Sequence, residues 1–338
     1  MPIEEQPLVM VSSSSDFPVN EAVIAETFQG KARYHIIDLP MVPLSRKEED
    51  NLIKELAEAK GFFVRPGIIS RHVIMNSKNL QIIAVHGAGV DQIDVAAATE
   101  ADIMVTNVPG GNANGVAELA LGFMLALVRR IPQCAWLVQH EGKWEEARWK
   151  GNELQGKTLG VVGCGNVGKR VIALACAFDM SVIAYDPLVT ADAIQQYGAT
   201  PADLNTVLSS CDILTVHVPL SEQTRYLISE SELASMKKGA LLINTSRGSV
   251  IDGQALYQSL LNGHLGGAAL DVMEKEPPGP EPLLSLPNVI VTPHMAGSTH
   301  EALATIARVA CEDIVRVLQG KEPQHCVNQE SLKGVIKK

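Results

Sequence analysis

The sequence predicts an α/β protein with two doubly wound parallel sheets. Short apolar segments, typical of buried strands, alternate with amphipathic segments, typical of helices, from about residue 8 and again from about residue 159. The chain has 338 residues, 46% of them hydrophobic, which is enough for two cores. A stretch rich in glycine and asparagine at 108–115 separates the two series and predicts a hinge.

The first series alternates strands and helices up to residue 106. Strands are predicted at 8–12, 34–39, 61–64, 80–86 and 103–106, and helices at 21–28 and 46–59. No Asn-Gly hairpin signal joins these strands. We therefore expect them to be parallel, with helices on both faces of the sheet.

The second series has the same alternation and the size of a nucleotide-binding domain. Strands are predicted at 159–162, 181–185, 213–216, 241–244, 268–270 and 289–292, and helices at 168–178, 230–236 and 254–262. A largely apolar helix at 116–130 precedes this series, and an amphipathic helix at 301–318 follows it. We expect the last helix to return to the first domain. The predicted domains are therefore 1–108 with 298–338, and an inserted domain at 109–297.

A glycine-rich turn follows the strand at 159–162. Gly163, Gly165 and Gly168 have the Gly-x-Gly-x-x-Gly spacing, and a helix is predicted directly after them. Such a turn lets the backbone approach a pyrophosphate at the positive end of a helix. Asp186 ends the next predicted strand, where a carboxylate can accept both hydroxyl groups of an adenosine ribose. The combination predicts a dinucleotide site, because a plain strand-to-helix turn leaves Asp186 unexplained.

Asp186 also favours one dinucleotide over the other. A carboxylate repels the 2′-phosphate of NADP, and Pro187 and Leu188 follow Asp186 instead of an arginine. The predicted cofactor is therefore NAD.

Three polar residues each follow a different strand of the second series: Arg247, Glu276 and His294. Ligands of open α/β sheets bind outside the carboxyl ends of the strands, so we expect these side chains beside the dinucleotide. They suit hydride transfer to a 2-oxo acid. A guanidinium anchors the carboxylate and polarises the carbonyl. An imidazole transfers the proton, and a nearby carboxylate orients and charges that imidazole.

Each of these residues also has a plainer interpretation. Glu276 is equally typical of a solvated loop, His294 of a helix cap and Arg247 of a surface turn. His217, at another strand end, is a rival base, although a buried histidine is the commoner outcome at such a position. His86 is a weaker rival.

The first domain has a candidate anion site of its own. A glycine turn follows the strand at 80–86, and glycines expose backbone N–H groups that bind anions. We assign Ala88 and Gly89 to the substrate carboxylate. Arg65, just past the strand at 61–64, is a candidate for a second anionic group such as a phosphate; a surface salt bridge is the alternative.

The composition argues against several classes of protein. The net charge is −10 and no basic run occurs, which argues against a nucleic acid partner. The six cysteines have no metal-ligand spacing, which predicts a reducing compartment and no metal. The first residues lack a signal-peptide pattern, and the longest apolar run, 119–128, is too short to span a bilayer. We expect a cytoplasmic protein that does not bind a membrane.

Several segments together resemble the D-isomer-specific 2-hydroxyacid dehydrogenases, over almost the whole chain. They are residues 86–94, 107–118, 158–168 with Asp186, 243–248, 270–277 and 292–297. The resemblance implies a Rossmann NAD-binding domain inserted into a flavodoxin-like substrate domain, and a homodimer formed through the helix at 116–130. It implies that Arg247, Glu276 and His294 are the catalytic residues and that Arg247 also binds substrate. The implied cofactor contacts are Gly163, Gly165, Asn166, Val167, Gly168, Asp186, Val218, Thr245, Arg247, Asp271, His294 and Gly297.

Within this family, residues 64–68 resemble the loop whose arginine meets the substrate phosphate in the phosphoglycerate dehydrogenase branch, although Pro66 and Gly67 depart from its usual residues. The expected substrate is therefore of the 3-phosphoglycerate type, in a short form without a C-terminal regulatory domain. A glyoxylate or hydroxypyruvate reductase is the alternative. A corepressor-like interaction protein that senses NADH is the alternative of another class, because such proteins keep the same three residues.

Overall fold

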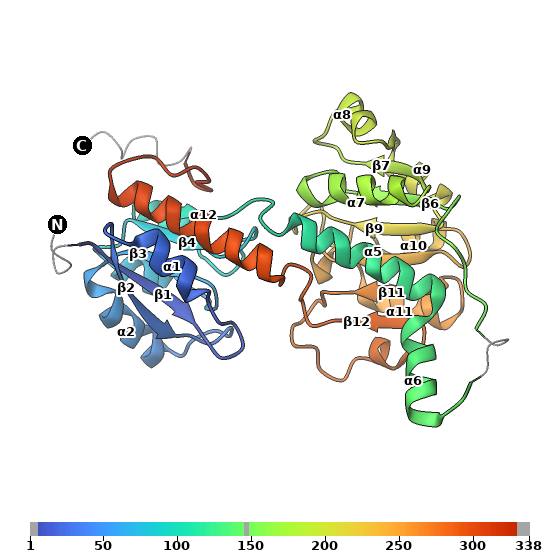
Figure 1. Ribbon diagram of the computed structural model, residues 1–338, viewed down its shortest axis with the longest axis horizontal. Helices are drawn as coiled ribbons and strands as arrows, with labels where there is room; N and C mark the ends of the chain where they lie inside the picture. The colour runs from blue at the N-terminus through green and yellow to red at the C-terminus, as the bar shows by residue number, and fades with distance from the viewer. Residues whose placement is uncertain (1–5, 145–148, 330–338) are drawn as a thin grey trace. The chain divides into compact units, whose positions relative to one another are not determined.

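The computed structural model describes residues 6–144 and 149–329, and the chain divides into two compact units (Figure 1). Unit 1 comprises residues 1–112 and 299–338, and unit 2 comprises residues 113–298. Unit 1 is therefore built from two separate stretches of the chain, with unit 2 inserted between them.

Unit 1 contains a five-stranded parallel sheet in its described part, in the order β2-β1-β3-β4-β5. Its elements are β1 (Leu8–Ser13), α1 (Glu21–Phe28), β2 (Arg33–Asp38), α2 (Arg46–Glu55), the 3-10 helix η2 (Leu56–Glu58), β3 (Ala59–Val64), α3 (Arg71–Asn76), β4 (Ile82–Val85), α4 (Val95–Glu100), β5 (Met104–Thr106) and α12 (His300–Leu318). This strand order is that of flavodoxin-like folds.

Alternating side chains of this sheet enter two different cores. Val9 and Phe63 pack with apolar residues of α1 and α12 on one face. Met10 and Phe62 pack with α2, α3 and α4 on the other. Consecutive strand residues point to opposite faces, so the same short strands supply both cores. Figure 1 shows α1 and α12 side by side over the first of these faces.

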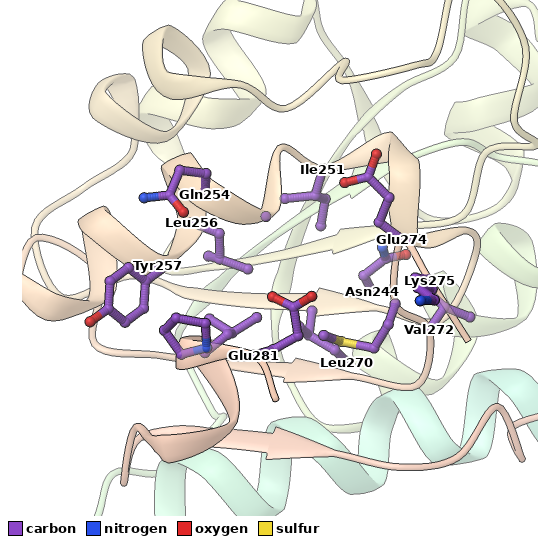
Figure 2. A pocket seen from close by; sticks show the side chains of 15 residues that line it. Asn244, Ile251, Gln254, Leu256, Tyr257, Leu270, Val272, Glu274, Lys275 and Glu281 are labelled. Carbon is purple, nitrogen blue, oxygen red and sulfur yellow. The ribbon is translucent and has the colours of Figure 1, made fainter. Parts of the chain in front are cut away.

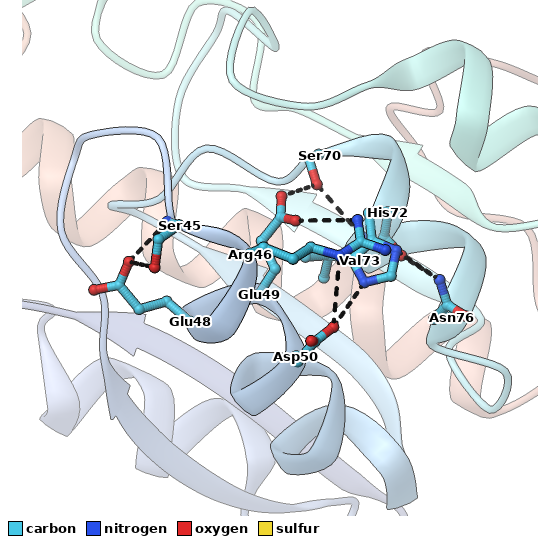
Figure 3. A network of polar contacts seen from close by, with 9 residues as sticks. All are labelled: Ser45, Arg46, Glu48, Glu49, Asp50, Ser70, His72, Val73 and Asn76. Carbon is cyan, nitrogen blue, oxygen red and sulfur yellow. Dashed lines mark hydrogen bonds and ion pairs between the residues drawn. The ribbon is translucent and has the colours of Figure 1, made fainter.

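Polar contacts join α2 and α3 at the surface of unit 1 (Figure 3). Nε2 of His72 lies 2.9 Å from Oδ1 of Asp50, and the Ser70 hydroxyl donates to Glu49. Ser45 and Glu48 form a capping box at the start of α2. These contacts fix the two helices against each other.

Unit 2 contains a seven-stranded parallel sheet in its described part, in the order β12-β11-β10-β9-β6-β7-β8. Its elements are α5 (Ala113–Arg129), α6 (Ile131–Glu141), β6 (Thr158–Val162), α7 (Asn166–Ala177), β7 (Ser181–Tyr185), α8 (Ala191–Gln196), β8 (Thr200–Pro201), α9 (Leu204–Ser210), β9 (Ile213–Val216), α10 (Glu230–Ser235), β10 (Leu241–Asn244), the 3-10 helix η4 (Gly248–Val250), α11 (Gly253–Leu261), β11 (Gly267–Leu270), the 3-10 helix η5 (Pro282–Ser285) and β12 (Val289–Val291). Counted from β6, this is the Rossmann order with one further strand.

Helices cover both faces of this second sheet. Leu159 and Val161 of β6 pack with α5 and α7, whereas Val162 packs with α9, α10 and α11 on the other face. The chain reverses its direction of winding between β6 and β9, which are neighbours in the sheet. Ligands of such sheets bind at this switch point. The predicted fold class, two doubly wound parallel sheets with a Rossmann order in the second, is confirmed.

Two predicted helices differ from those observed. The helix expected at 46–59 is wrong in its last part: α2 ends at Glu55, η2 follows, and β3 begins at Ala59. Leu56, fully buried, anchors that tight turn. The helix expected at 116–130 begins at Ala113, and a second helix, α6, follows it. Arg130 separates the two, because its φ of +52° is left-handed and ends α5.

Within the described residues, no single helix has the length and apolar character needed to span a bilayer. The bent pair of α5 and α6 would pass that test together, by length and composition alone.

Candidate active site

The glycine turn joins β6 to α7, and its three glycines have different roles. Gly163 has a φ of +96°, and a Cβ there would lie 2.5 Å from the His217 carbonyl oxygen. A Cβ on Gly168 would overlap the carbonyl of Gly163. Gly165 instead faces open space, with no atom within 4 Å of a Cβ built there. Two glycines therefore let the turn close, and the third leaves room above it for a bound group.

The helix that follows the turn is open at its amino end. Gly165 is the N-cap of α7 and provides no side-chain hydrogen bond, and Asn166 and Val167 form the first turn. N–H groups there, together with the helix dipole, favour an anion. Asp186 lies next to this turn, because its Oδ2 accepts from the backbone N of Cys164 at 2.7 Å and its Oδ1 from that of Leu188 at 2.8 Å. A carboxylate has about four acceptor positions, so Asp186 can accept further hydrogen bonds.

Glu276 and His294 form a direct pair on the loops after β11 and β12. Nδ1 of His294 lies 2.6 Å from Oε2 of Glu276, and Oε1 of Glu276 accepts from the backbone N of Met273 at 2.9 Å. The hydrogen bond with Glu276 raises the pKa of His294, against the lowering effect of burial. Burial raises the pKa of Glu276, but the hydrogen bond and charge of His294 outweigh it and hold that pKa below its usual value. Each member of the pair therefore favours the charged form of the other, carboxylate for Glu276 and imidazolium for His294.

Arg247 lies near enough to influence both members of this pair. It precedes η4 on the loop after β10, and its Nη1 donates to the Ser246 carbonyl at 2.8 Å. Its positive charge lowers the pKa of Glu276 and opposes the rise in that of His294. The structure thus brings the three residues predicted at separate strand ends into one electrostatic group, because β10, β11 and β12 are adjacent.

The loop that carries His294 is held by Asp271, which directly follows β11. Asp271 is 1% exposed, and its carboxylate accepts from the Thr292 hydroxyl and from the backbone N of Met295 and Ala296, at 2.5 to 2.8 Å. The carbonyl oxygen of Asp271 accepts from the backbone N of His294 at 2.9 Å. His294 itself has a φ of +52°, uncommon for a residue with a side chain and frequent at functional sites. The sequence analysis predicted Asp271 as a cofactor contact but did not predict these hydrogen bonds to the loop.

The other predicted cofactor positions lie on neighbouring loops. Val218 follows β9, and its Cγ1 lies 2.9 Å from a Cβ built on Gly163. Thr245 is buried directly after β10. Gly297 follows the His294 segment, in the loop that ends unit 2.

The comparisons with known proteins agree with this geometry. The model of the NAD-binding domain of D-isomer-specific 2-hydroxyacid dehydrogenases matches residues 121–296. The chain belongs to this family. The chain is 44% identical over 291 residues to D-3-phosphoglycerate dehydrogenase of Archaeoglobus fulgidus. The matched region is 86% of this chain and 54% of that protein. It is 44% identical over 276 residues to hydroxypyruvate reductase of Thermotoga maritima. That matched region is 80% of this chain and 89% of that protein. The predicted family and NAD-binding domain are confirmed.

Solved structures give the same result. A glyoxylate reductase from Paecilomyes thermophila superimposes with a TM-score of 0.84 at 26% identity, over 98% of this chain and all of that one. The TT0316 protein of Thermus thermophilus does so with a TM-score of 0.83 at 32% identity, over 95% and 99%. The chain spans about half the length of the phosphoglycerate dehydrogenases that it matches, and nearly the full length of the hydroxypyruvate reductase.

The two rival histidines are poor bases at neutral pH. Burial lowers the pKa of His217 to about 3, and its ring contacts the hydroxyl groups of Thr215 and Thr245. Burial also lowers the pKa of His86 to about 4, helped by the charge of Arg65. A proton carrier needs a pKa near the working pH, so His294 is the best candidate of the three.

In unit 1, the predicted anion-binding groups are open to a ligand. Among the described residues, no acceptor receives a hydrogen bond from the backbone N of Ala88 or Gly89. Arg65 is half-buried, and its Nη1 donates to the carbonyl of Pro18. No carboxylate in the described part of the chain lies within 4 Å of its guanidinium, which weakens the salt-bridge interpretation.

A pocket of about 310 Å³ lies beneath the segment between β11 and Glu276 (Figure 2). Asn244, Tyr257, Glu274, Lys275 and Glu281 are among the residues that line it. Arg247, Glu276 and His294 do not line it, so this pocket is separate from the charged group described above.

Proposed function

We propose that the chain is an NAD-dependent oxidoreductase that transfers hydride between nicotinamide and a small D-2-hydroxy acid or 2-oxo acid. The observation that carries this proposal is the Glu276–His294 pair with Arg247 beside it. The pair holds an acidic proton on an imidazole, and the guanidinium provides a fixed positive charge. Reduction of a 2-oxo acid requires both.

Arg247 binds the substrate carboxylate and polarises the reacting carbonyl. His294 donates the proton to the oxygen of the emerging alcohol, or removes it in the oxidative direction. Glu276 holds the imidazole by its Nδ1, so that Nε2 is the atom that exchanges the proton. The cofactor, when bound, supplies or accepts the hydride.

The residues present fit NAD. Gly165 leaves space above the turn, and the N–H groups of Asn166 and Val167 suit a pyrophosphate. Asp186 suits the ribose hydroxyl groups and repels a 2′-phosphate, which favours NAD over NADP. The other proposed cofactor contacts are Gly163, Gly168, Val218, Thr245, Arg247, Asp271, His294 and Gly297.

Unit 1 and the relatives support a proposed substrate class. We assign Ala88 and Gly89 to an anionic group of the substrate, and Arg65 to a second one such as a phosphate. A 3-phosphoglycerate-type substrate is the first candidate, because several relatives are named D-3-phosphoglycerate dehydrogenase. Hydroxypyruvate is the second, because the hydroxypyruvate reductase matches this chain over 89% of its own length.

The direct test is an assay of the purified chain with 3-phosphohydroxypyruvate, hydroxypyruvate and glyoxylate, each with NADH and with NADPH. We expect NADH oxidation with at least one of these acids, and slower turnover with NADPH. Failure of all three acids, with NADH still bound, would support the interaction-protein alternative instead.

Glu276→Gln should shift the pH profile of kcat/KM to lower pH. The pKa of His294 is raised by Glu276, so the imidazolium persists to higher pH when the carboxylate is present. In the reductive direction, kcat/KM falls as pH rises through that pKa. Without the negative charge the fall should come at lower pH, as pH profiles of both proteins will show.

Glu274→Gln is the matched control for that variant, because Glu274 lies on the same loop and bonds to Tyr226 instead of His294. Its profile should equal that of the wild type. An unchanged profile in Glu276→Gln would contradict the assigned role of the pair.

Arg65→Ala should selectively weaken the binding of phosphorylated substrates. Loss of a charge-assisted hydrogen bond should raise KM for 3-phosphohydroxypyruvate by about 10- to 100-fold and leave glyoxylate nearly unchanged. Arg71→Ala is the control, since Arg71 pairs with Glu100 at the surface of the same unit. An equal loss with both substrates would count against the phosphate assignment.

We also propose that the protein is a cytoplasmic homodimer that uses α5 and α6. Helix α6 has no buried residue, and its Ile131, Trp136 and Val138 are exposed. Apolar side chains gathered on one helix favour a protein partner.

All six cysteines are free thiols, as a reducing compartment requires. Sedimentation of the purified chain tests the dimer.

A further inference from the structure

The side chain of Asn244, the last residue of β10, bonds to the turn that carries Arg247. Asn244 is 1% exposed. Its Oδ1 accepts from the backbone N of Ser246 at 2.9 Å and from the Ser246 hydroxyl at 2.7 Å. Its Nδ2 donates to the carbonyl oxygen of Arg247 at 2.9 Å. The oxygen of this buried amide therefore bonds to Ser246, and its nitrogen bonds to Arg247.

The same turn is held from its other side. Gly248 follows Arg247, and a Cβ there would overlap the peptide between Met273 and Glu274. The Arg247 turn therefore lies directly against the loop that ends in Glu276. The backbone oxygen of Asn244 also accepts from the backbone N of Asp271 at 2.9 Å, at the start of that loop.

These contacts restrict Arg247 at two points. Asn244 holds its carbonyl, and its Nη1 donates to the carbonyl of Ser246, the residue whose N–H and hydroxyl Asn244 also holds. A change at the amide of Asn244 would therefore move the backbone of the turn and the acceptor that orients the guanidinium. Displacements of about 1 Å in a reacting group lower rates strongly.

We propose that Asn244 is a positioning residue that sets the place of the Arg247 guanidinium for catalysis. Asn244 acts through Arg247 and has no contact with substrate in this scheme. The proposal rests on the function proposed above for Arg247. It predicts a functional effect for a buried amide that the sequence presents only as the end of a strand.

The variant Asn244→Asp tests this with almost no change of volume. The introduced carboxylate still accepts from Ser246, but it repels the carbonyl of Arg247 where Nδ2 donated. We expect kcat/KM for the 2-oxo acid to fall about 10- to 100-fold at alkaline pH, with the Kd of NADH changed much less. A protonated carboxyl has one O–H donor, so the deficit relative to the wild type should shrink as pH falls.

Asn262→Asp is the matched control. Asn262 forms the same type of turn after α11, with its Oδ1 accepting from the backbone N of His264 at 2.9 Å, but it lies outside the charged site. Its kcat/KM should equal that of the wild type at every pH. A pH-dependent deficit of equal size there would overturn the interpretation of the Asn244 result.

A double-mutant cycle separates positioning from general damage. If Asn244 acts through Arg247, then Asn244→Asp should cause almost no further loss of kcat/KM in the Arg247→Ala background. Additive losses would overturn the proposal, because they would mean that Asn244 supports activity by another route.

Hydrogen exchange provides a readout that does not depend on activity. Peptides covering residues 241–252 should exchange faster in Asn244→Asp than in the wild type, whereas peptides covering β6 should be unchanged. If the wild type reduces no 2-oxo acid but this local change appears, the proposed function fails and the turn contact stands. If the wild type is active and Asn244→Asp has full activity at alkaline pH, the positioning role itself is refuted.

Discussion

Replacing Arg247 with alanine should lower kcat/KM for 2-oxo acids by about 100- to 1000-fold. This is the typical cost of removing one fixed group that stabilises developing negative charge in an active site. Arg247 also lies close enough to Glu276 and His294 to alter the pKa of each. Steady-state kinetics with the preferred acid will measure the loss.

Two further measurements make this prediction specific. NADH binding, followed by fluorescence, should weaken far less than catalysis in Arg247→Ala, because the glycine turn and Asp186, which hold the pyrophosphate and the ribose in our proposal, lie on other loops. Arg247→Lys should recover only part of the rate, since an ammonium lacks the paired donors of a guanidinium. Full activity in Arg247→Ala would refute the assignment of the substrate anchor.

Replacing His294 with alanine should lower kcat by about 100- to 10,000-fold, the usual contribution of a positioned general acid or base. The loss should occur in both directions, because the same imidazole donates the proton in reduction and accepts it in oxidation. The pH dependence that His294 causes should also disappear. Rates measured across pH in each direction, together with NADH binding, test these three expectations.

His217→Ala is the informative comparison for that variant. The pKa of His217 is lowered to about 3 by burial, so its ring is neutral and cannot supply a proton at working pH. It should therefore retain the pH profile of the wild type, whatever its effect on stability. Normal turnover in His294→Ala with loss in His217→Ala would reverse the assignment of the base.

Strands and glycine turns were the most predictable features of the fold. The predicted strand at 159–162 lies within β6, and that at 213–216 has the bounds of β9. Strands buried on both faces leave short apolar runs with clear ends. The glycine turn was equally predictable, because Gly163 and Gly168 have no room for a side chain and must be glycine.

Helix ends were less predictable. The segment at 56–58 consists of good helix formers without a glycine or proline, yet the chain leaves the helix there so that Ala59 can pair with Leu8. Tertiary pairing outweighs local propensity in this case. The helix expected at 116–130 was close at its end, since α5 ends at Arg129, but it begins three residues earlier than expected, at Ala113.

The candidate active site also has a part that the sequence predicted and a part that it did not. Arg247, Glu276 and His294 were identified because each follows a strand, and adjacent parallel strands bring their ends together. The side chains that hold them were not identified. Asp271 bonds to residues about 25 positions away in the chain, and Asn244 bonds within its own turn, so neither contact has a periodic pattern.

The return of α12 to the first sheet has a consequence for synthesis on the ribosome. Helix α12 packs against β3 and β4, so one face of the first sheet, with Val9, Phe63 and Ile82, is covered partly by α1 and partly by residues made almost 300 positions after β1. The inserted unit is continuous in sequence and can fold as soon as it emerges. The nascent chain therefore carries a partly uncovered apolar face through most of translation, and a chaperone that binds such faces would engage residues 8–85 during that interval.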